Sequence, residues 1–326
     1  VYMGVVDVFE RDARQAAGGV RRRSPAFGNV LKQFQQYFTV HFIPRSAAAE
    51  VGSVRGSVVV VRFGSAEAAE AGTRVMPQQR RKVFVVIPCR YGSSRFAGKP
   101  LAPIAGISMI QRVYERAVGT RGVVQVLVAT DDARIADAVS AFGGTAIMTA
   151  ASARSGTDRV AEAAGRLAAA PDDVVVNVQG DQPMLDPGHI EDVSQPLLSE
   201  PGVAMATLAF RIVDPRELTD PKDVKVAIDR RGFALYFSRA TIPFCRDPES
   251  PHGVYKHLGI YAYRRDFLDV FCRLPAGTLE EVEKLEQLRA LEWGHPIRVV
   301  VTKKDSPEVD LPEDIQRVEA RLRRKS

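Results

Sequence analysis

The sequence predicts an α/β protein built on an open, mostly parallel, Rossmann-like sheet with a small antiparallel excursion. From Val83 onward, short apolar runs of strand length alternate with segments in which apolar residues recur every three or four positions. The run 174–176 is wholly apolar, which indicates a strand in a sheet covered on both faces. Near residue 230, two strand-like segments flank a glycine-containing turn and indicate an antiparallel pair.

The parallel part of the sheet follows from the alternation between residues 83 and 179. Parallel neighbours need a crossover, usually a helix, so each strand–helix–strand unit predicts two parallel strands. The segment 108–118, for example, places Met109, Ile110 and Val113 on one helical face. The predicted elements, in order, are strand 83–88, helix 108–118, strand 123–130, helix 135–142, extended segment 145–149, helix 156–169 and strand 173–179.

The antiparallel excursion begins at about residue 220. Its first two strands flank Arg230-Arg231-Gly232, a sequence suited to a tight turn. Apolar residues recur every third position between Val282 and Leu291, which predicts one continuous helix. The elements predicted in this part are strands 224–229, 233–238, 257–263 and 297–302, helix 279–293 and a closing helix from Pro312.

The charge of the chain is unevenly spread. The formal net charge is +6, but residues 1–82 carry +7 and residues 83–326 carry −1. A nearly neutral body argues against nucleic acid as a partner. No apolar run approaches the length of about 20 residues that a membrane helix needs, so we expect no membrane span. The three cysteines lack metal-ligand spacing and suit a reducing compartment, which predicts a cytoplasmic protein.

Residues 1–75 differ in composition from the rest. They contain Arg21-Arg22-Arg23, tracts of Ala, Gly and Ser, and no sustained helical or strand period. We therefore predict an N-terminal extension, either disordered or upstream of the true start at Met76, followed by one catalytic domain, 76–326. A chain that begins at Met76 is expected to keep the fold and the activity. The alternative is a targeting segment, which Asp7, Glu10 and Asp12 disfavour.

The loop 88–101, directly after the first strand, is the first candidate site. Ligands of open α/β sheets bind beyond the carboxyl ends of the strands, and this loop carries Arg90, Arg95 and Lys99 among small residues. It is not a Walker A loop, because five residues separate its glycines and Pro100 follows the lysine. The pattern predicts a phosphate-binding loop; the alternative is an ordinary solvated basic loop.

Two aspartates are candidates for binding a divalent cation. Asp181 follows Gly180 at the end of the most apolar strand, and Asp310 follows the last strand. Carboxylate oxygens suit a hard ion such as Mg²⁺. Each aspartate could instead have a purely structural role. Asp181 could form a turn, and Asp310 could cap the helix that begins near Pro312. A shared metal site requires the fold to bring the two together.

Taken together, these segments resemble the sugar-acid cytidylyltransferases, in particular those that act on 3-deoxy-manno-octulosonate (Kdo). The loop is similar to the family signature IPARxxSxRLPGKPL, with Cys89 in place of Ala and Phe96-Ala97 in place of Leu-Pro. The similarity covers about residues 83–324 and leaves 1–75 without a counterpart. The other matching segments are 129–131, 148–149, 155–159, 178–181, 234–243, 257–261, 285–289 and 309–314.

The resemblance implies a fold of the nucleotide-diphospho-sugar transferase type and the reaction CTP + Kdo giving CMP-Kdo and pyrophosphate, with Mg²⁺ as cofactor and a homodimer as assembly. It implies catalytic roles for Arg90, Lys99, Asp181 and Asp310, the two aspartates being the metal ligands. The implied CTP-binding residues are Arg90, Ser94, Arg95, Lys99, Ser155 and Gly156, and the implied sugar-binding residues are Gln179, Arg239, His257, Tyr261, Glu286 and Gln287.

Two alternatives remain open at this point. CMP-sialate synthetase, or another sugar nucleotidyltransferase, shares the nucleotide loop. The segments 233–243 and 257–261 favour the eight-carbon acid over sialic acid. A protein of another class, a non-catalytic module that binds nucleotides or polyanions, is suggested only by the pI of about 9.3. The presence of both Asp181 and Asp310 disfavours that module.

Overall fold

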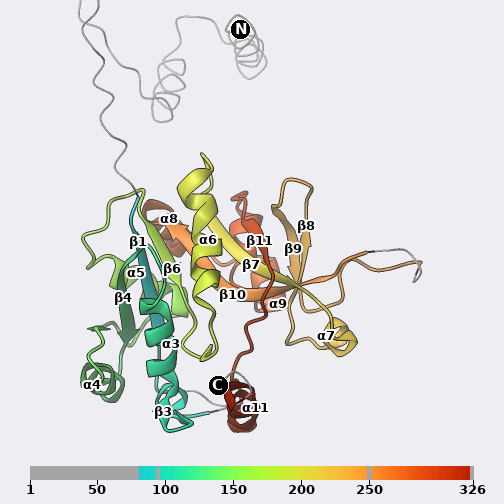
Figure 1. Cartoon of the computed structure of the whole chain (residues 1–326). Coiled ribbons are helices and arrows are strands. Elements are labelled where there is room, and N and C mark those ends of the chain that lie inside the picture. The colour runs from blue at the N-terminus through green and yellow to red at the C-terminus, as the bar shows by residue number, and fades with distance from the viewer. Residues whose placement is uncertain (1–80, 93–95, 248–251, 324–326) are drawn as a thin grey trace, which may run out of the picture. The chain divides into compact units, whose positions relative to one another are not determined.

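The computed structural model describes residues 81–92, 96–247 and 252–323 (Figure 1). These residues fall within one compact unit, Gln78–Ser326. The predicted extension 1–75 and the start at Met76 lie outside the described residues, and so do Ser94 and Arg95. None of the helices formed by the described residues has the length and apolar character that a membrane crossing requires.

The central sheet confirms the predicted fold class. β1 pairs in parallel with β4 on one side and with β6 on the other, and β4 pairs in parallel with β5. The strand order is β11-β7-β10-β6-β1-β4-β5 (Figure 1). The strands are β1 (Val83–Cys89), β4 (Val123–Thr130), β5 (Ala146–Met148), β6 (Val174–Asn177), β7 (Met205–Arg211), β10 (Tyr255–Arg264) and β11 (Arg298–Thr302).

The antiparallel part has two components. β8 (Lys225–Ile228) and β9 (Ala234–Ser238) form the predicted hairpin, which joins the sheet through β10. β10 itself lies inside the main sheet and runs antiparallel to both β6 and β7. A separate small sheet consists of β2 (Pro103–Ile104) and β3 (Ile107–Ser108).

Helices cover both faces of the sheet, as the apolar run 174–176 predicts. Val174 and Val176 pack with α3 and α6 on one face, while Val175 packs with α5 and α8 on the other. The helices are α3 (Met109–Val118), α4 (Ala133–Ala141), α5 (Gly156–Ala164), α6 (Pro187–Ser199), α7 (Pro215–Thr219), α8 (Arg265–Arg273), α9 (Thr278–Glu283), α10 (Leu288–Glu292) and α11 (Pro312–Arg323).

The sheet arrangement determines where a ligand can bind. β1 and β6 are parallel neighbours, so their carboxyl ends meet at the same edge. The loop after β1 contains a short 3₁₀ helix, Lys99–Leu101, and the turn after β6 contains Asp181. This is the edge at which open α/β sheets bind their ligands.

Candidate functional site

A cavity of about 300 Å³ lies at the carboxyl ends of β1 and β6. We call it the strand-end cavity. Residues from three separate parts of the chain line it: the loop after β1, the start of α5 and the turn after β6. The sequence-predicted residues that the fold brings together here are Arg90, Lys99, Ser155, Gly156, Gln179 and Asp181.

The lining of the strand-end cavity is strongly basic. Besides Arg90 and Lys99 it includes Arg154 and Arg159, and Asp181 is the one carboxylate among its lining residues. The start of α5 also faces this cavity, and Ser155 caps that helix by accepting a hydrogen bond from the Asp158 amide at 3.1 Å. A helix N-terminus carries a partial positive charge. The arrangement suits a polyanion such as a triphosphate.

Sequence reasoning assigned no role to Arg154 or Arg159. Arg159 is buried, and its guanidinium forms an ion pair of 2.9 Å with Asp131. The only sequence signal was its position inside the matching segment 155–159, directly after the helix start. Arg154 precedes that segment, and its exposed side chain pairs with Asp158 at 3.1 Å.

Lys99 connects the two candidate metal-binding segments. Its Nζ donates to Asp181 Oδ2 at 2.7 Å and to the Val309 carbonyl oxygen at 3.0 Å. The Val309 amide in turn donates to the Asp181 carbonyl oxygen at 3.0 Å. The fold therefore brings the segment that carries Asp310 to the tip of β6, as a shared site requires.

The residues present fit a hard cation in part. Asp181 Oδ1 is buried and has no hydrogen-bond partner among the described residues, so one oxygen is available for a ligand. Within the part of the chain that the structure describes, no group of three or more His, Cys, Asp or Glu side chains could hold a metal ion. Any ion here would therefore need further ligands, such as phosphate oxygens or water.

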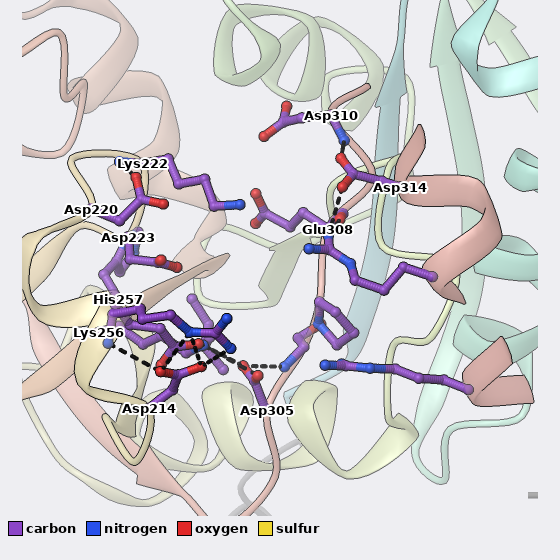
Figure 2. Close-up of a pocket in the computed structure, with 17 residues that line it drawn as sticks. Asp214, Asp220, Lys222, Asp223, Lys256, His257, Asp305, Glu308, Asp310 and Asp314 are labelled. Atoms are coloured by element: carbon purple, nitrogen blue, oxygen red, sulfur yellow. Dashed lines mark hydrogen bonds and ion pairs between the residues drawn. The ribbon is translucent and has the colours of Figure 1, made fainter. Parts of the chain in front are cut away.

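Asp310 lies beside a second, larger cavity of about 420 Å³, which we call the charged cavity. Figure 2 shows Asp310 and Glu308 on one side of it and His257 on the other. The backbone amides of Asp310 and Leu311 donate to Asp314 Oδ2 at 2.9 and 3.0 Å. Asp314 lies in the first turn of α11 and satisfies the two amides that precede the helix.

Glu308 adds a third carboxylate that the sequence did not indicate. Loss of solvation raises the pKa of the Glu308 carboxyl to about 7, and the nearby charges of Asp181 and Asp310 act in the same direction. Gln182 Nε2 donates to Glu308 Oε1 at 3.0 Å. With a pKa of about 7, this carboxyl is partly protonated near neutral pH and adds only part of a negative charge to the attraction of a cation.

His257 and Tyr261 both lie on β10, four residues apart. The His257 ring contacts Tyr261 and Phe237, with ring centroids 5.3 and 5.1 Å away, and its Nε2 lies 2.9 Å from Thr207 Oγ1. Burial lowers the pKa of His257 to about 3, so the imidazole is neutral near pH 7. It can hydrogen-bond a ligand but does not contribute a positive charge.

Arg239, Glu286 and Gln287 line neither cavity. The Arg239 Nε and Nη1 atoms donate to the carbonyl oxygens of Glu283 and Pro221 at 2.8 and 2.9 Å. Glu286 Oε1 and Gln287 Nε2 are buried without a hydrogen-bond partner among the described residues. Such atoms are costly unless a ligand or water satisfies them, which fits recognition of hydroxyl groups. Gln179, expected with this set, lies instead in the strand-end cavity.

Gly180 allows the tip of β6 to approach β1 closely. A Cβ at this position would lie 2.5 Å from Cys89 Sγ, while the next nearest atoms, Pro88 O and Ile87 Cγ2, are 3.4 and 3.7 Å away. Cys89 is buried, so its sulfur cannot move into solvent. In this chain the sulfur leaves no room for a side chain at position 180.

We expect Gly180→Ala to destabilise the protein by about 1–3 kcal/mol, the usual cost of overpacking a filled core. The same substitution made in a Cys89→Ala background should cost little, because the nearest remaining atom is then at ordinary contact distance. Thermal and urea unfolding of the four proteins checks this. An equal loss of stability in both backgrounds would contradict the steric explanation.

Comparisons with known proteins agree with this geometry. The family profile that matches residues 84–303 is described as cytidylyltransferase. A 3-deoxy-manno-octulosonate cytidylyltransferase from Desulfosudis oleivorans is 60% identical over 241 residues, which cover 74% of this chain and 97% of the relative. An 8-amino-3,8-dideoxy-manno-octulosonate cytidylyltransferase from Shewanella piezotolerans is 58% identical over 241 residues, covering 74% and 98%. A solved structure of CMP:2-keto-3-deoxy-manno-octonic acid synthetase complexed with CTP has a TM-score of 0.71 at 45% identity, covering 75% of this chain and 100% of that one.

Proposed function

Because the chain belongs to the cytidylyltransferase family, we propose that it transfers CMP from CTP to Kdo, giving CMP-Kdo and pyrophosphate. CMP-Kdo would supply Kdo for lipopolysaccharide synthesis. The observation that carries the proposal is the strand-end cavity, where Arg90, Lys99 and Asp181 converge from separate segments. The match covers nearly the full length of the Kdo-specific relative, so it includes both the nucleotide and the sugar segments.

The strand-end cavity would hold the triphosphate. Arg90 and Lys99, together with Arg154 and Arg159, provide four cations around one carboxylate. Charge-assisted hydrogen bonds from such groups to phosphate oxygens are strong and fix the orientation of the chain of phosphates. Arg90 is exposed and Lys99 is mostly buried, so the two would contact phosphates at different depths.

In the proposed reaction, the anomeric hydroxyl oxygen of Kdo forms a bond to the α-phosphorus of CTP. The bond from that phosphorus to the bridging oxygen breaks, pyrophosphate leaves with the electron pair, and the hydroxyl proton passes to solvent or to the departing pyrophosphate. No residue that lines the strand-end cavity is proposed as the base: burial raises the pKa of the Cys89 thiol, which keeps it protonated, and Asp181 is paired with Lys99 and assigned to the metal ion. The chain would contribute mainly alignment and electrostatic stabilisation, as in other phosphoryl transfers.

We propose Mg²⁺ as the cofactor, held by Asp181 and Asp310. When bound, the ion would neutralise charge on the phosphates and lower the pKa of the attacking hydroxyl. Two observations support the site: the unpartnered Oδ1 of Asp181, and the hydrogen bonds that bring the segment carrying Asp310 to the tip of β6. Lys99 holds the other oxygen of Asp181 at 2.7 Å, so its ammonium balances the carboxylate until a cation binds.

The sugar acid would be bound by the second set of residues. Arg239 suits the sugar carboxylate, and the unpartnered atoms of Glu286 and Gln287 suit its hydroxyls. His257, being neutral, and Tyr261 would add hydrogen bonds and an apolar surface. Gln179 lies on the nucleotide side, so its contact with the sugar would come close to the reacting phosphorus.

Arg239→Lys is expected to weaken binding of the sugar acid more than binding of CTP. Backbone carbonyls already hold two of the three guanidinium nitrogens, and a lysine cannot keep those bonds and also present a forked donor to a carboxylate. We expect KM for the sugar acid to rise about tenfold, the effect of one charge-assisted hydrogen bond, with KM for CTP within about twofold. Steady-state kinetics with each substrate varied in turn checks this. Equal increases of both KM values would count against the assignment.

The proposed reaction is tested by pyrophosphate release with CTP, Mg²⁺ and a panel of acceptors. The panel holds Kdo, its 8-amino-8-deoxy analogue, sialic acid and hexose 1-phosphates. The amino sugar is included because relatives of both names are nearly equally identical to this chain. The proposal is supported if kcat/KM is highest with Kdo. A higher kcat/KM with the amino sugar or with sialic acid would mean that this sugar, and not Kdo, is the acceptor. Nucleotide binding without turnover would indicate a non-catalytic module.

We further propose a cytoplasmic homodimer that does not bind nucleic acid or membranes. Leu235 on β9 and Phe244 after it are 64% and 86% exposed, which fits a surface that another copy covers. The three cysteines are free, in keeping with a reducing compartment. Light scattering after size-exclusion chromatography measures the oligomeric state directly, and a monomer at micromolar concentration would refute the dimer.

A further inference from the structure

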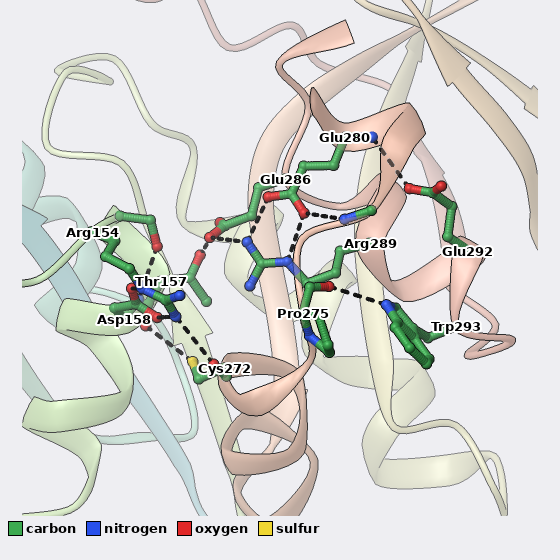
Figure 3. A network of polar contacts seen from close by, with 12 residues as sticks. Arg154, Thr157, Asp158, Cys272, Pro275, Glu280, Glu286, Arg289, Glu292 and Trp293 are labelled. Atoms are coloured by element: carbon green, nitrogen blue, oxygen red, sulfur yellow. Dashed lines mark hydrogen bonds and ion pairs between the residues drawn. The ribbon is translucent and has the colours of Figure 1, made fainter. Parts of the chain in front are cut away.

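Thr157 joins the start of α5 to a residue of the proposed sugar site. It is the second residue of the helix, follows Ser155 and Gly156, which line the strand-end cavity, and is 3% exposed. Its Oγ1 donates to Glu286 Oε2 at 2.5 Å, across 129 positions of sequence (Figure 3). The first turn of α5 therefore lines the strand-end cavity with Gly156 and Arg159 and contacts a sugar-site carboxylate with Thr157.

The other oxygen of Glu286 faces a rigidly held arginine. Arg289 Nη2 lies 3.7 Å from Glu286 Oε1, too far for a hydrogen bond but close enough for attraction. Arg289 is buried, and Glu280 accepts two hydrogen bonds from it, at 2.7 Å from Nε and 2.5 Å from Nη2 (Figure 3). Its guanidinium also lies 5.1 Å from the Phe271 ring centroid. Arg289 therefore cannot move without breaking other contacts, whereas Thr157 moves with the first turn of α5.

We propose that Thr157 is a positioning residue that couples nucleotide binding to sugar binding by fixing the Glu286 carboxylate. The inference rests on the proposed function. CTP phosphates at Ser155 and Gly156 would immobilise the first turn of α5, and the Thr157 hydroxyl transmits that order to Glu286. The oxygen then presented to a sugar hydroxyl is Oε1, which is buried, faces Arg289 and accepts no hydrogen bond from the described residues.

Coupling of this kind is reciprocal. If CTP improves the affinity for the sugar acid by some factor, the sugar acid improves the affinity for CTP by the same factor. The threonine suits this role because a buried, β-branched side chain has few rotamers, so its hydroxyl follows the helix backbone. A hydroxyl that only anchored the chain would affect stability and leave the coupling unchanged.

Three variants separate positioning from anchoring. Thr157→Val removes the hydroxyl and keeps the shape, and Thr157→Ser keeps the hydroxyl. Thr120→Val removes the hydroxyl of another buried threonine, which follows α3 and donates to the Arg116 carbonyl oxygen of that helix. We expect Thr157→Val to raise KM for the sugar acid at saturating CTP about tenfold and KM for CTP at saturating sugar acid by a similar factor, while the affinity for CTP alone changes less than about twofold. Thr157→Ser and Thr120→Val should stay within about twofold of wild type.

The coupling itself is measured by titrating the sugar acid with and without a CTP analogue whose α,β-bridge is a methylene group. Wild type should bind the sugar more tightly in the presence of the analogue, and Thr157→Val should lose most of that gain. Glu286→Ala combined with Thr157→Val should be no worse than Glu286→Ala alone by more than about twofold, because Glu286→Ala already removes the acceptor of the Thr157 hydroxyl.

Other outcomes overturn the proposal. Equal damage in Thr157→Ser and Thr157→Val, unchanged coupling in Thr157→Val, or additive effects in the double variant would each assign Thr157 an anchoring role. The proposed reaction is judged separately, by wild-type turnover with the acceptor panel. If the wild type prefers another acceptor, the same variants are measured with that acceptor, and a result for Thr157 is still obtained.

Discussion

Replacing either Asp181 or Asp310 by asparagine is expected to lower kcat/KM about a thousandfold, equivalent to about 4 kcal/mol, while leaving the fold intact. An amide keeps the shape of the side chain but loses the charge that binds a hard cation. The Asp181 variant should still fold because Lys99 keeps its hydrogen bond to Val309. CTP should still bind weakly, since Arg90 would contact the phosphates and not the metal.

The measurements separate the metal role from a structural one. Kinetics at saturating Mg²⁺ give the loss of turnover, and melting curves with and without Mg²⁺ show whether the ion still stabilises the protein. Asp137→Asn, on the exposed face of α4, is the matched control and should behave as wild type. Near-normal turnover of Asp310→Asn would instead leave Asp310 as a structural residue at the start of α11 and refute the two-aspartate site.

The sequence predicted best those helices and strands whose buried faces follow from the spacing of apolar residues along the chain. Successive residues of a strand point to opposite faces of the sheet, so the wholly apolar run 174–176 predicted burial on both faces. The helical period of apolar residues located α3, α4 and the start of α5. The prediction of a mostly parallel sheet is confirmed for the same reason, because each helix between strands requires a crossover.

The predicted helix 279–293 is wrong as a continuous element, because tertiary contacts interrupt it. α9 ends at Glu283, and Lys284 adopts a left-handed conformation with φ of 53°. The Glu283 carbonyl oxygen accepts from Arg239, and its carboxylate accepts from the Ser238 hydroxyl and the Arg239 amide. These bonds tie the chain to β9 and turn it before α10. The period of the apolar residues carries no information about such partners.

Other elements were not predicted at all. α6 contains Pro196 in its interior, a residue that normally signals a helix end, and its His189 is buried with Nε2 3.0 Å from the Lys304 carbonyl oxygen. The position of β10 between β6 and β7 also escaped prediction. Strand patterns identify strands but do not identify their partners, since pairing depends on residues far apart in sequence.

The candidate site was predictable to the extent that it lies in continuous motifs. The loop after β1 and the turn after β6 carried enough chemistry to indicate phosphate and metal binding, and the fold brings them to one cavity. Thr157 and Arg289 carried no signal beyond their positions in the matching segments 155–159 and 285–289, because a threonine near a helix start and an arginine in a helix are common. Their importance comes from Glu286, which only the folded chain places between them.

Lys99→Met is expected to lower kcat/KM by about a hundred- to a thousandfold, the range seen when one preorganised electrostatic contact to a transition state is removed. The backbone holds Lys99 firmly: the Gly98 amide donates to Tyr91 O at 3.0 Å, and Gly98 has a φ of 70°. Methionine keeps most of the aliphatic part of the lysine side chain, so packing changes little. The substitution therefore removes mainly the positive charge. Lys303→Met removes an exposed lysine elsewhere and should leave turnover unchanged.

Lys99 is proposed both to pair with Asp181 and to contact the CTP phosphates, and measurements of Mg²⁺ binding distinguish these two roles. In the free protein its ammonium neutralises Asp181, so removing it leaves that carboxylate without its cation and should not weaken binding of Mg²⁺. With CTP present the same ammonium would contact phosphates, so affinity for CTP should fall along with turnover. Calorimetry of Mg²⁺ and of CTP binding measures both effects. If Lys99→Met loses less than about tenfold in kcat/KM, the lysine serves only as the partner of Asp181, and its assignment to the phosphates is wrong.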